Sequence, residues 1–406
     1  MKIAVFTDLY LDVPGGIPSS IKAQKKALKE LGHEVTVFCP GFSCDDKDVV
    51  LVPTMKRLKI NGAPVARGPR KVVEFVKRKF PVFSQFDIVH VHYEASCSIA
   101  GVMLAQEFKV PLVQTMHGRE DMAIAVNVPH PLKTVTGNAL NLLHGNYLPH
   151  SRIVLQDDEL AATSARAAMW TLMVNQANAA DQVITPSEQF AEKLRKYGVT
   201  RPITAVSNGV ADELAEGEWP VRERTASEPL KMIWNSRVSR EKRMLPLLMA
   251  LSKIAHLPFL LDVYGNGNEL KKAKRYVRRH GLERKVKFHG AVPHDSLLAK
   301  MEKMHLSVTV SYGFDTQGLT LLEAIATGLP VFYCDPDLAE SVPKGAGVCA
   351  EGSDIDSMAE MLRNIINTPE CIREMSEAAL KGRKQALQSA QIKKLLAVYR
   401  SARRQG

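Results

Sequence analysis

The chain has 406 residues, of which 45% are hydrophobic and 24% charged, and its formal net charge is +11. This composition is that of a soluble globular protein and excludes a disordered one. The length exceeds what one hydrophobic core usually serves, so we expect two domains. A transmembrane helix is also excluded, since no apolar run approaches roughly 18 residues, and the N-terminus MKIAVFTDLY lacks the apolar region of a signal peptide.

Six cysteines, at positions 39, 44, 97, 334, 349 and 371, lie far apart and without CxxC spacing. This spacing indicates reduced thiols and not a disulfide framework or a zinc site. We therefore expect a cytoplasmic protein.

Basic residues are concentrated in two places. Residues 56–79 carry nine Lys or Arg and one acid, and the chain after Glu377 carries eight Lys or Arg and no acid. This balance predicts attraction to a membrane, a nucleic acid or anionic sugar phosphates. We expect no nucleic acid, because the basic stretches have few aromatic residues and no recognised binding module.

Strands and helices alternate from the first residue, which indicates a parallel sheet with helices on both faces. The apolar strand Lys2–Phe6 precedes a helix at Ser19–Leu31 and a second strand at Glu34–Cys39. The remaining strands of this half are expected at Asp87–His92, Pro111–His117, Gln182–Pro186 and Ile203–Ser207. The helices between them are expected at Ala95–Phe108, Glu159–Asn178 and Ser187–Tyr197.

The alternation restarts after a stretch at Asn208–Pro229 that reads as a linker, and the chain ends in a long basic helical stretch at Pro369–Arg404. We predict an α/β protein of two doubly wound domains, residues 1–209 and 210–382, with a ligand cleft between the C-terminal edges of their sheets. A C-terminal helix at about 383–406 is expected to pack back on the first domain. The strands of the second domain are expected at Lys231–Asn235, Phe259–Tyr264, Val286–His289, Leu306–Ser311, Val331–Cys334 and Gly347–Cys349.

The first candidate site is the turn Asp12–Ser20, DVPGGIPSS, which follows the first strand and opens a helix. Gly15 and Gly16 allow the backbone to approach a ligand at a positive helix N-terminus. The turn is not the GxGxxG fingerprint of dinucleotide-binding proteins, and a plain glycine turn is an equal alternative.

Three histidines lie in or at the end of predicted strands. His90 and His92 alternate within a strand and therefore point to one face, where they could bind a metal, although packing of one and polar contact of the other is more common. His117 ends its strand, and ligands of open sheets bind at that edge. We predict a functional role for His117 and no metal site.

Arg237 and Lys242 follow the first strand of the second domain and lie at the start of its first helix. Five residues apart, they can converge on one anion, the guanidinium in bidentate fashion and the ammonium as a point charge. Cations are disfavoured at a helix N-terminus unless an anion offsets them. This placement predicts a diphosphate site.

The stretch Ser311–Asp335 combines a glycine turn, a short helix and two acids, Asp315 and Glu323. Glu323 lies among apolar residues, where a carboxylate is costly to bury unless something donates a hydrogen bond to it. The pattern indicates a polyhydroxylated, phosphorylated ligand; Asp315 as a helix cap and Glu323 as the partner of a nearby base are the structural alternatives. Asp335 and Asp337 form a DxD pair, but we expect no metal there.

Residues Arg70–Phe80 can form a basic amphipathic helix, with Val72, Val73 and Val76 on one side and cations on the other. Such a helix can lie on an anionic membrane, or it can be an ordinary solvated helix face.

The chain resembles the retaining glycosyltransferases with two Rossmann-like domains (GT-B), in the large group-1, family 4 type that includes bacterial mannosyl-, glucosyl- and N-acetylglucosaminyltransferases. Each motif is modest alone, but eight in the family's order, covering nearly the whole chain, are specific. They are the PGG loop, TMHG, ADQVITPSE, SNGV, SRVSREK, YGNGNEL, KFHGAVPHDSL and the two acids separated by seven residues.

The resemblance implies roles for matching positions. Arg237 and Lys242 would hold the donor's diphosphate, Glu323 the ribose, and Asp315 the sugar hydroxyls. The other implied contacts are His117 beside the transferred sugar, Gly16 by the phosphates, the backbone of Gln317, Gly318 and Leu319 near sugar and phosphate, and the loops Gly265–Gly267 and Gly290–Val292 around the base.

The resemblance further implies transfer of a hexose from a nucleoside-diphosphate sugar, with a UDP-sugar favoured, with retention of configuration and without a cofactor or metal. The motif DTQGLT is most similar to the corresponding motif of the diacylglycerol glucosyltransferases. This similarity implies a lipid or glycan acceptor at the inner face of the cell membrane. The family usually has glutamate where this chain has Asp315, so the sugar contact is shortened by one methylene. A sugar-nucleotide 2-epimerase and a non-catalytic sugar-nucleotide or membrane-binding protein remain alternatives.

Overall fold

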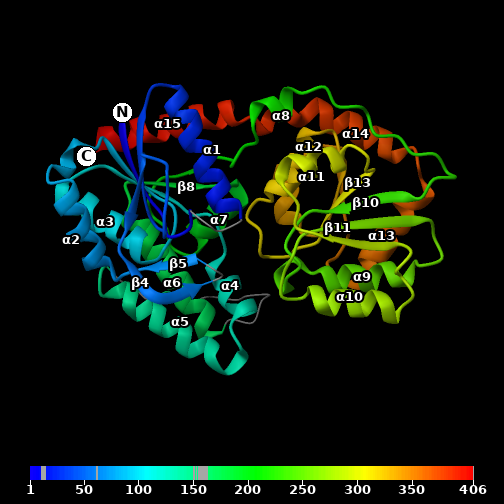
Figure 1. Cartoon of the computed structure of the whole chain (residues 1–406), viewed down its shortest axis with the longest axis horizontal. Helices are drawn as coiled ribbons and strands as arrows, with labels where there is room; N and C mark the ends of the chain where they lie inside the picture. The colour runs from blue at the N-terminus through cyan, green and yellow to red at the C-terminus, as the bar shows by residue number, and fades with distance from the viewer. Residues whose placement is uncertain (11–14, 61–62, 150, 152, 154–162, 406) are drawn as a thin grey trace. The chain divides into compact units, whose positions relative to one another are not determined.

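A computed structural model describes residues 1–406 apart from 11–14, 61–62, 150, 152, 154–162 and 406 (Figure 1). The chain divides into two compact units. Unit 1 comprises Met1–Asn208 with Gln388–Gly406, and unit 2 comprises Gly209–Leu387. Within the described residues no helix is both long and apolar enough to cross a membrane.

Unit 1 is built on a parallel seven-stranded sheet, and its strands are mostly buried because helices cover both faces. The strand order reverses between β1 and β6, which places a topological switch point there. A separate antiparallel pair joins β4 (Thr54–Ile60) to β5 (Ala63–Ala66). The sheet strands in spatial order are β3 (Val49–Val52), β2 (Glu34–Pro40), β1 (Lys2–Phe6), β6 (Ile88–Val91), β7 (Leu112–Thr115), β8 (Gln182–Thr185) and β9 (Ile203–Ala205).

Two hydrophobic clusters fill the two faces of this sheet. One packs beneath α2, α3, α6 and α7, and the other beneath α1 and α15. Ile392, Leu395 and Tyr399 of α15 are buried in the second cluster, so the C-terminal helix is part of unit 1. The helices are α1 (Gly16–Glu30), α2 (Pro69–Lys79), α3 (Ser96–Phe108), α4 (Glu120–Asn127), α5 (His130–Gly145), α6 (Ser164–Asn178), α7 (Glu188–Lys196) and α15 (Gln388–Gln405).

Unit 2 is built on a parallel six-stranded sheet whose switch point lies between β10 and β13. Helices α9, α10 and α13 cover one face, and α11, α12 and α14 cover the other (Figure 1). The strands in spatial order are β12 (Val286–Gly290), β11 (Phe259–Tyr264), β10 (Leu230–Trp234), β13 (Leu306–Thr309), β14 (Val331–Tyr333) and β15 (Gly347–Cys349). The helices are α8 (Asp212–Glu216), α9 (Met244–Lys253), α10 (Leu270–Arg279), α11 (His294–Met301), α12 (Leu319–Ala326), α13 (Ile355–Asn367) and α14 (Cys371–Gly382).

The interpretation of Asn208–Pro229 as a linker is wrong. The segment contains α8 and two buried arginines that bind it to unit 2. Arg222 donates to the carbonyl oxygen of Thr327 at 3.0 Å, and Arg224 donates to the carbonyl oxygen of Ile366. Charged residues suggested a solvated linker, but these guanidinium groups satisfy backbone carbonyls inside the fold.

The expected single helical stretch at Pro369–Arg404 is also wrong in one respect. Helix α14 ends at Gly382, a short 3-10 turn follows at Arg383–Ala386, and α15 then begins at Gln388. The two helices belong to different units. A residue-by-residue apolar pattern does not show that interruption, because both helices are amphipathic.

Candidate functional site

The predicted site residues of unit 2 lie in loops that leave one edge of its sheet. Lys242 follows β10 and Asp315 follows β13, the two strands that flank the switch point. The Lys242 Nζ atom lies 2.6 and 2.8 Å from the two carboxylate oxygens of Asp315, and both side chains are largely shielded from solvent. The structure therefore brings together two residues that the sequence separates by 73 positions.

The Lys242–Asp315 pair is held by a third group. The hydroxyl of Ser311 donates to Asp315 Oδ2, so this carboxylate accepts hydrogen bonds from two sides. An ammonium has three N–H donors, and the ammonium of Lys242 donates to both oxygens of Asp315. The aspartate fixes the position of the ammonium, and the ammonium carries its charge at the sheet edge where ligands of such folds bind.

Arg237 is oriented by an acid that the sequence analysis did not single out. Arg237 is exposed, and its guanidinium lies 3.1 Å from Oε1 of the buried Glu241. The Ser239 hydroxyl donates to the same oxygen at 2.5 Å. Because Glu241 is fixed by burial, it limits where the Arg237 guanidinium can lie. An acid inside the string SREK was the signal that could have identified it.

The premise that Arg237 and Lys242 begin a helix is wrong. Lys242 ends a short 3-10 turn at Arg240–Lys242, and Arg243 adopts a left-handed conformation with φ 62° before α9 starts at Met244. The unfavourable placement of cations at a helix N-terminus therefore does not apply to them. Their candidacy depends on their position at the sheet edge.

Glu323 lies on α12, and its carboxylate remains partly accessible while its neighbours are buried. Its Oε1 lies 2.9 Å from Nε2 of His294, the first residue of α11. This hydrogen bond raises the pKa of His294 above its ordinary value of 6.5. Glu323 is thus the partner of a base in this structure, and His294 is a site residue that the sequence analysis named only within a motif.

The loop before α12 places backbone groups beside Glu323. Gly318 is the N-cap of α12, which begins at Leu319, and the Gln317 side chain donates to Ser341 Oγ at 3.4 Å. First-turn amides of a helix are ready anion donors. At the same sheet edge, Val292 packs in the hydrophobic cluster that contains Tyr264. The ring of Tyr264 stacks on that of His289, with 4.6 Å between the ring centroids.

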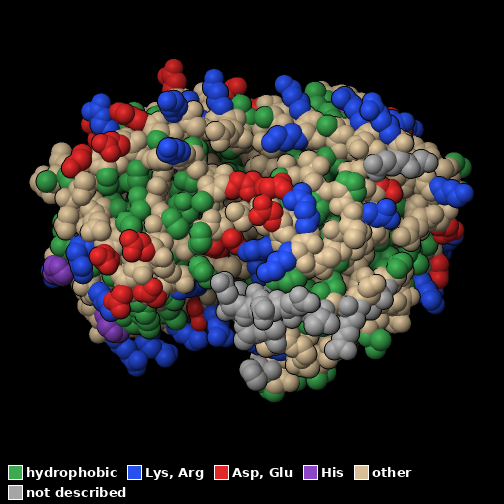
Figure 2. All heavy atoms as spheres, turned by 180° about the vertical axis from the view of Figure 1, so that it is seen from behind, with side chains coloured by type: hydrophobic (Ala, Val, Ile, Leu, Met, Phe, Trp, Pro, Cys, Tyr) green, Lys and Arg blue, Asp and Glu red, His purple; other side chains and the backbone are tan. Residues whose placement is uncertain are grey.

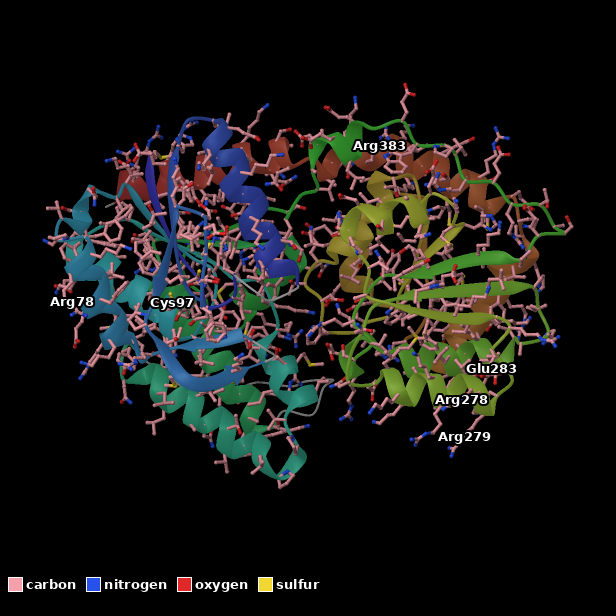
Figure 3. All side chains as sticks on the ribbon, in the orientation of Figure 1. Arg78, Cys97, Arg278, Arg279, Glu283 and Arg383 are labelled. Carbon is pink, nitrogen blue, oxygen red and sulfur yellow. The ribbon has the colours of Figure 1, made fainter. Side chains whose placement is uncertain are left out.

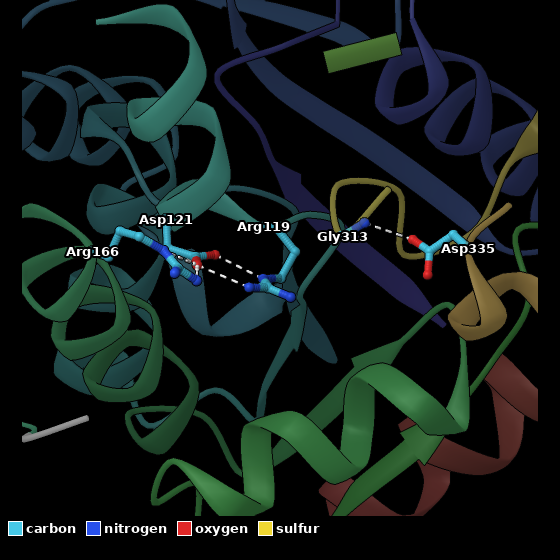
Figure 4. A network of polar contacts seen from close by, with 5 residues as sticks. All are labelled: Arg119, Asp121, Arg166, Gly313 and Asp335. Atoms are coloured by element: carbon cyan, nitrogen blue, oxygen red, sulfur yellow. Dashed lines mark hydrogen bonds and ion pairs between the residues drawn. The ribbon is translucent and has the colours of Figure 1, made fainter. Parts of the chain in front are cut away.

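Asp335 has a structural role. Its Oδ2 accepts from the backbone N–H of Gly313 at 2.7 Å (Figure 4), and its Oδ1 accepts from that of Asp337 at 3.1 Å. These bonds hold the loop that carries Asp315. Among the described residues no group of three His, Cys, Asp or Glu could hold a metal ion.

In unit 1, three imidazoles form a buried chain. His92 Nδ1 lies 2.9 Å from His117 Nε2, and His92 Nε2 lies 3.2 Å from His90 Nδ1. His90 in turn contacts the Tyr399 hydroxyl and Thr115 Oγ1, each at 2.7 Å. Burial lowers the pKa of His117 to about 4 and that of His90 to about 3, so both are neutral at pH 7.

The contacts among the three imidazoles fix the position of His117. This position differs from the one predicted from the sequence. Strand β7 ends at Thr115, so His117 lies two residues beyond the strand and not at its last position. The ring nitrogens of His90 and His92 lie within hydrogen-bond distance of each other and of His117, Tyr399 and Thr115. The loop continues through Gly118 and Arg119 to the start of α4 at Glu120. Asp121 in the first turn of α4 lies between the guanidinium groups of Arg119 and Arg166 (Figure 4), and the N···O distances are 2.7 and 2.6 Å.

The last predicted residue of unit 1, Gly16, is the first residue of α1. The preceding Gly15 has extended backbone angles, and its added Cβ would meet only Pro18 at 4.0 Å. Asp12, Val13 and Pro14 of the same turn lie outside the described residues.

Comparison with known proteins decides the family. The model described as Glycosyltransferase Family 4 matches residues 14–214, and the model described as Glycosyl transferases group 1 matches residues 216–382. The chain belongs to the group-1 glycosyltransferases of the GT-B fold.

This glycosyltransferase is 25% identical to the alpha-monoglucosyldiacylglycerol synthase of Streptococcus pneumoniae over 82% of its own chain and 70% of that protein. Its fold is similar to that of sucrose-phosphate synthase from Thermosynechococcus elongatus, with a TM-score of 0.74, 18% identity and 98% of both chains covered. The Anabaena protein HepE, solved in complex with UDP and glucose, has a TM-score of 0.67 and 16% identity, again over 98% of both chains.

The loop Gly265–Gly267 of the glycosyltransferase packs so closely on the loop after β10 that no side chain fits at its two glycines. A Cβ on Gly265 would lie 2.1 Å from the carbonyl oxygen of Ser236, which also accepts from the Trp234 indole at 2.9 Å. Gly265 has φ +147°, and its N–H donates to Gly290 O at 2.8 Å. The two loops therefore pack together as one rigid unit beside Arg237.

We expect Gly265→Ala to lower the free energy of unfolding by about 2–4 kcal/mol, since backbone must move to admit the methyl group. Gly281→Ala is the matched control, because Gly281 has φ +64° with nothing within 4 Å of an added Cβ. That change should cost about 1–2 kcal/mol from backbone strain alone. Urea denaturation of both variants measures the difference, and equal losses would show that the close approach does not matter.

Proposed function

We propose that this glycosyltransferase moves a hexose from a UDP-sugar to a hydroxyl group of a lipid, such as diacylglycerol, with retention of anomeric configuration. The observation that carries the proposal is the Lys242–Asp315 pair at the switch point of unit 2, with Arg237 in the loop after β10 and Glu323 on α12. The S. pneumoniae relative and the UDP complex of HepE support the acceptor class and the nucleotide.

The cations of this edge suit a leaving diphosphate. In the proposed reaction the bond between C1 of the sugar and the β-phosphate oxygen breaks, and the acceptor oxygen bonds to C1 on the same face. The acceptor's proton passes to the leaving phosphate. Arg237 and Lys242 stabilise the negative charge that develops on that phosphate, the role that a metal ion performs in other transferases.

The two acids have separate roles in the proposal. Asp315 accepts a hydrogen bond from a sugar hydroxyl while it holds Lys242, and Glu323 accepts from the ribose hydroxyls. The backbone at Gln317–Leu319 lies beside the sugar and the phosphate, and Gly265 and Val292 lie beside the base. In unit 1, His117 contacts the sugar and Gly16 the phosphates.

Glu323 Oε1 is hydrogen-bonded to His294, and in the proposal the ribose hydroxyls take the place of His294 on this carboxylate. The displaced imidazole loses the interaction that raises its pKa, so it releases a proton between pH 6.5 and the raised value. UDP affinity therefore increases as pH rises through this range, by less than tenfold per pH unit for one proton. Isothermal titration calorimetry in buffers of different ionisation enthalpy measures the proton released. His294→Gln should abolish the pH dependence, and an unchanged dependence would contradict the ribose role of Glu323.

An acceptor-dependence assay tests the proposed function. The purified protein is incubated with UDP-[14C]glucose with and without diacylglycerol in detergent micelles, and the product is analysed by thin-layer chromatography and NMR. We expect a glycolipid with an α-linkage, formed only when acceptor is present. Release of UDP with an altered free sugar and no acceptor requirement would favour an epimerase. UDP binding without any turnover would favour the non-catalytic alternative.

A further inference from the structure

Helix α5 carries its apolar residues on the side that faces solvent. Leu132, Val135 and Leu142 are 54%, 66% and 70% exposed, and their spacing of three and seven residues puts them on one stripe. Leu140 and Leu143 border this stripe and are also exposed. Five of the 13 large hydrophobic side chains that are exposed in the described part of the chain thus lie on one helix.

The opposite side of α5 is small and polar, and it is buried. A Cβ on Gly137 would lie 3.0 Å from the carbonyl oxygen of Ala165 in α6, so the two helices touch backbone to backbone. His144 Nε2 lies 2.8 Å from Gln176 Oε1 of α6, and both side chains are buried. These contacts fix the rotation of α5 about its axis, and its leucines cannot turn inward without breaking them.

An inverted helix of this kind exposes apolar area that burial would stabilise by about 25 cal/mol per Å². Apolar residues gathered in one exposed stripe mark an interaction site, whereas single exposed residues do not. Leu31, the residue after α1, and Val82 before β6 are examples of such single residues. The stripe of Leu132, Val135 and Leu142 therefore indicates an interaction site.

The charge of the residues around α5 indicates what kind of surface binds the apolar stripe. Residues 122–156 contain no Asp or Glu. The guanidinium group of Arg70, at the start of α2, lies 5.8 Å from the ring centroid of Tyr147, which places the cationic helix α2 beside the end of α5. Lys71 and Arg78 of α2 are exposed, and Figure 3 shows Arg78 on the outer side of that helix. An apolar stripe with cations beside one end of its helix is complementary to an anionic lipid surface.

Helix α2 itself does not supply an apolar membrane face. Val72, Val73 and Val76 are buried in the core of unit 1, so the amphipathic pattern of Arg70–Phe80 is explained by packing. Two of its cations are also paired, Lys71 with Glu74 and Lys77 with Glu107. Helix α2 can contribute charge to a lipid surface but not inserted side chains.

We propose that α5 is the surface by which this protein docks on an anionic lipid bilayer, with its leucine stripe among the acyl chains and the cations of α2 at the headgroups. The proposal rests on the proposed function, because a diacylglycerol acceptor lies in a bilayer. A second copy of the chain is a poorer occupant, since the same cations would face each other across the interface. Lys and Arg side chains are spread widely over the face shown in Figure 2, so general charge must be separated from docking by α5.

Vesicle co-sedimentation of the full chain tests this surface. The variant Leu132→Ser/Val135→Ser/Leu142→Ser should bind vesicles of phosphatidylglycerol and phosphatidylcholine at least tenfold more weakly than the wild type, because three inserted aliphatic side chains are lost. The matched control Leu31→Ser/Val82→Ser changes exposed residues elsewhere in unit 1 and should bind as the wild type does. Circular dichroism confirms the fold, and Val135→Ser alone provides a milder variant with a smaller loss in the same direction.

A charge control compares two helices. Lys71→Ala/Arg78→Ala on α2 should weaken binding to the anionic vesicles, and Arg278→Ala/Arg279→Ala on α10, whose side chains project outward in Figure 3, should not. Equal effects of the two pairs would overturn the proposal in favour of general charge attraction. Undiminished binding of the α5 variant would also overturn it. A wild-type dimer in analytical ultracentrifugation that becomes monomeric in the α5 variant would assign the stripe to a second copy.

Transfer to a short-chain diacylglycerol in detergent micelles separates this proposal from the proposed function. Loss of docking alone leaves micellar activity of the α5 variant near that of the wild type. Absence of micellar activity in the wild type would instead refute the proposed function, and vesicle binding would still decide the role of α5.

Discussion

Replacing Lys242 with alanine is expected to lower kcat/KM for the UDP-sugar by about 10²–10³-fold. Removing one preorganised charge that stabilises the leaving group typically costs this much. The substitution also leaves the Asp315 carboxylate without its ammonium partner at the proposed phosphate position. Steady-state kinetics with the diacylglycerol acceptor measures the loss.

Lys253→Ala is the matched control for this change. Lys253 belongs to α9 of the same unit and pairs with Asp356, but both side chains are exposed and the pair lies on the helix surface. An exposed pair contributes about 0–1 kcal/mol to stability, so kcat/KM should be unchanged. Lys242→Ala activity within threefold of the wild type would contradict a role for Lys242 in stabilising the leaving group.

Replacing Asp315 with asparagine should separate sugar recognition from nucleotide recognition. The change removes the carboxylate that we assign to a sugar hydroxyl, and a hydrogen bond to a charged group contributes about 1.5–3 kcal/mol. We therefore expect kcat/KM for the UDP-sugar to fall by about 10–150-fold. The affinity for UDP, which lacks the transferred hexose, should stay the same or increase, because the charge of Lys242 is no longer offset.

Two further variants complete the Asp315 experiment. Glu323→Gln should weaken UDP itself, because its partner in the proposal is the ribose. Asp315→Glu restores the usual family residue but lengthens the side chain in a space closed by Lys242 and Ser311. We expect it to change rate or sugar preference. Unchanged rate and preference in Asp315→Glu, or weaker UDP binding in Asp315→Asn, would refute the sugar role of Asp315.

Much of the fold could be predicted because the buried strands of a parallel sheet appear in the sequence as short apolar runs. The strand Phe259–Tyr264 is predicted and observed with the same bounds, since a mostly apolar run of this short length between turn residues favours a strand over a helix. The same signal places Arg237, Asp315 and Glu323 after strands or at a helix start, and a sheet edge then brings such loops together.

Other parts of the site depend on contacts between distant residues that local patterns do not show. His294 meets Glu323 across 29 positions, and His90 meets Tyr399 across 309. Helix α5 was missed for a related reason. Its hydrophobic residues follow a helical period, but the period does not show which side is buried, and Gly137 and His144 decide that through α6.

The central claim is that the sheet edge of unit 2 binds the nucleoside diphosphate of a sugar donor, and thermal unfolding with UDP, GDP and ADP tests it most directly. A ligand at 100 times its dissociation constant adds about 2.7 kcal/mol to stability. We predict that UDP stabilises the wild type by this amount and that Arg237→Ala/Lys242→Ala loses the effect while Lys253→Ala retains it. No stabilisation by any of the three nucleotides, or equal stabilisation of the Arg237→Ala/Lys242→Ala variant, would contradict the claim.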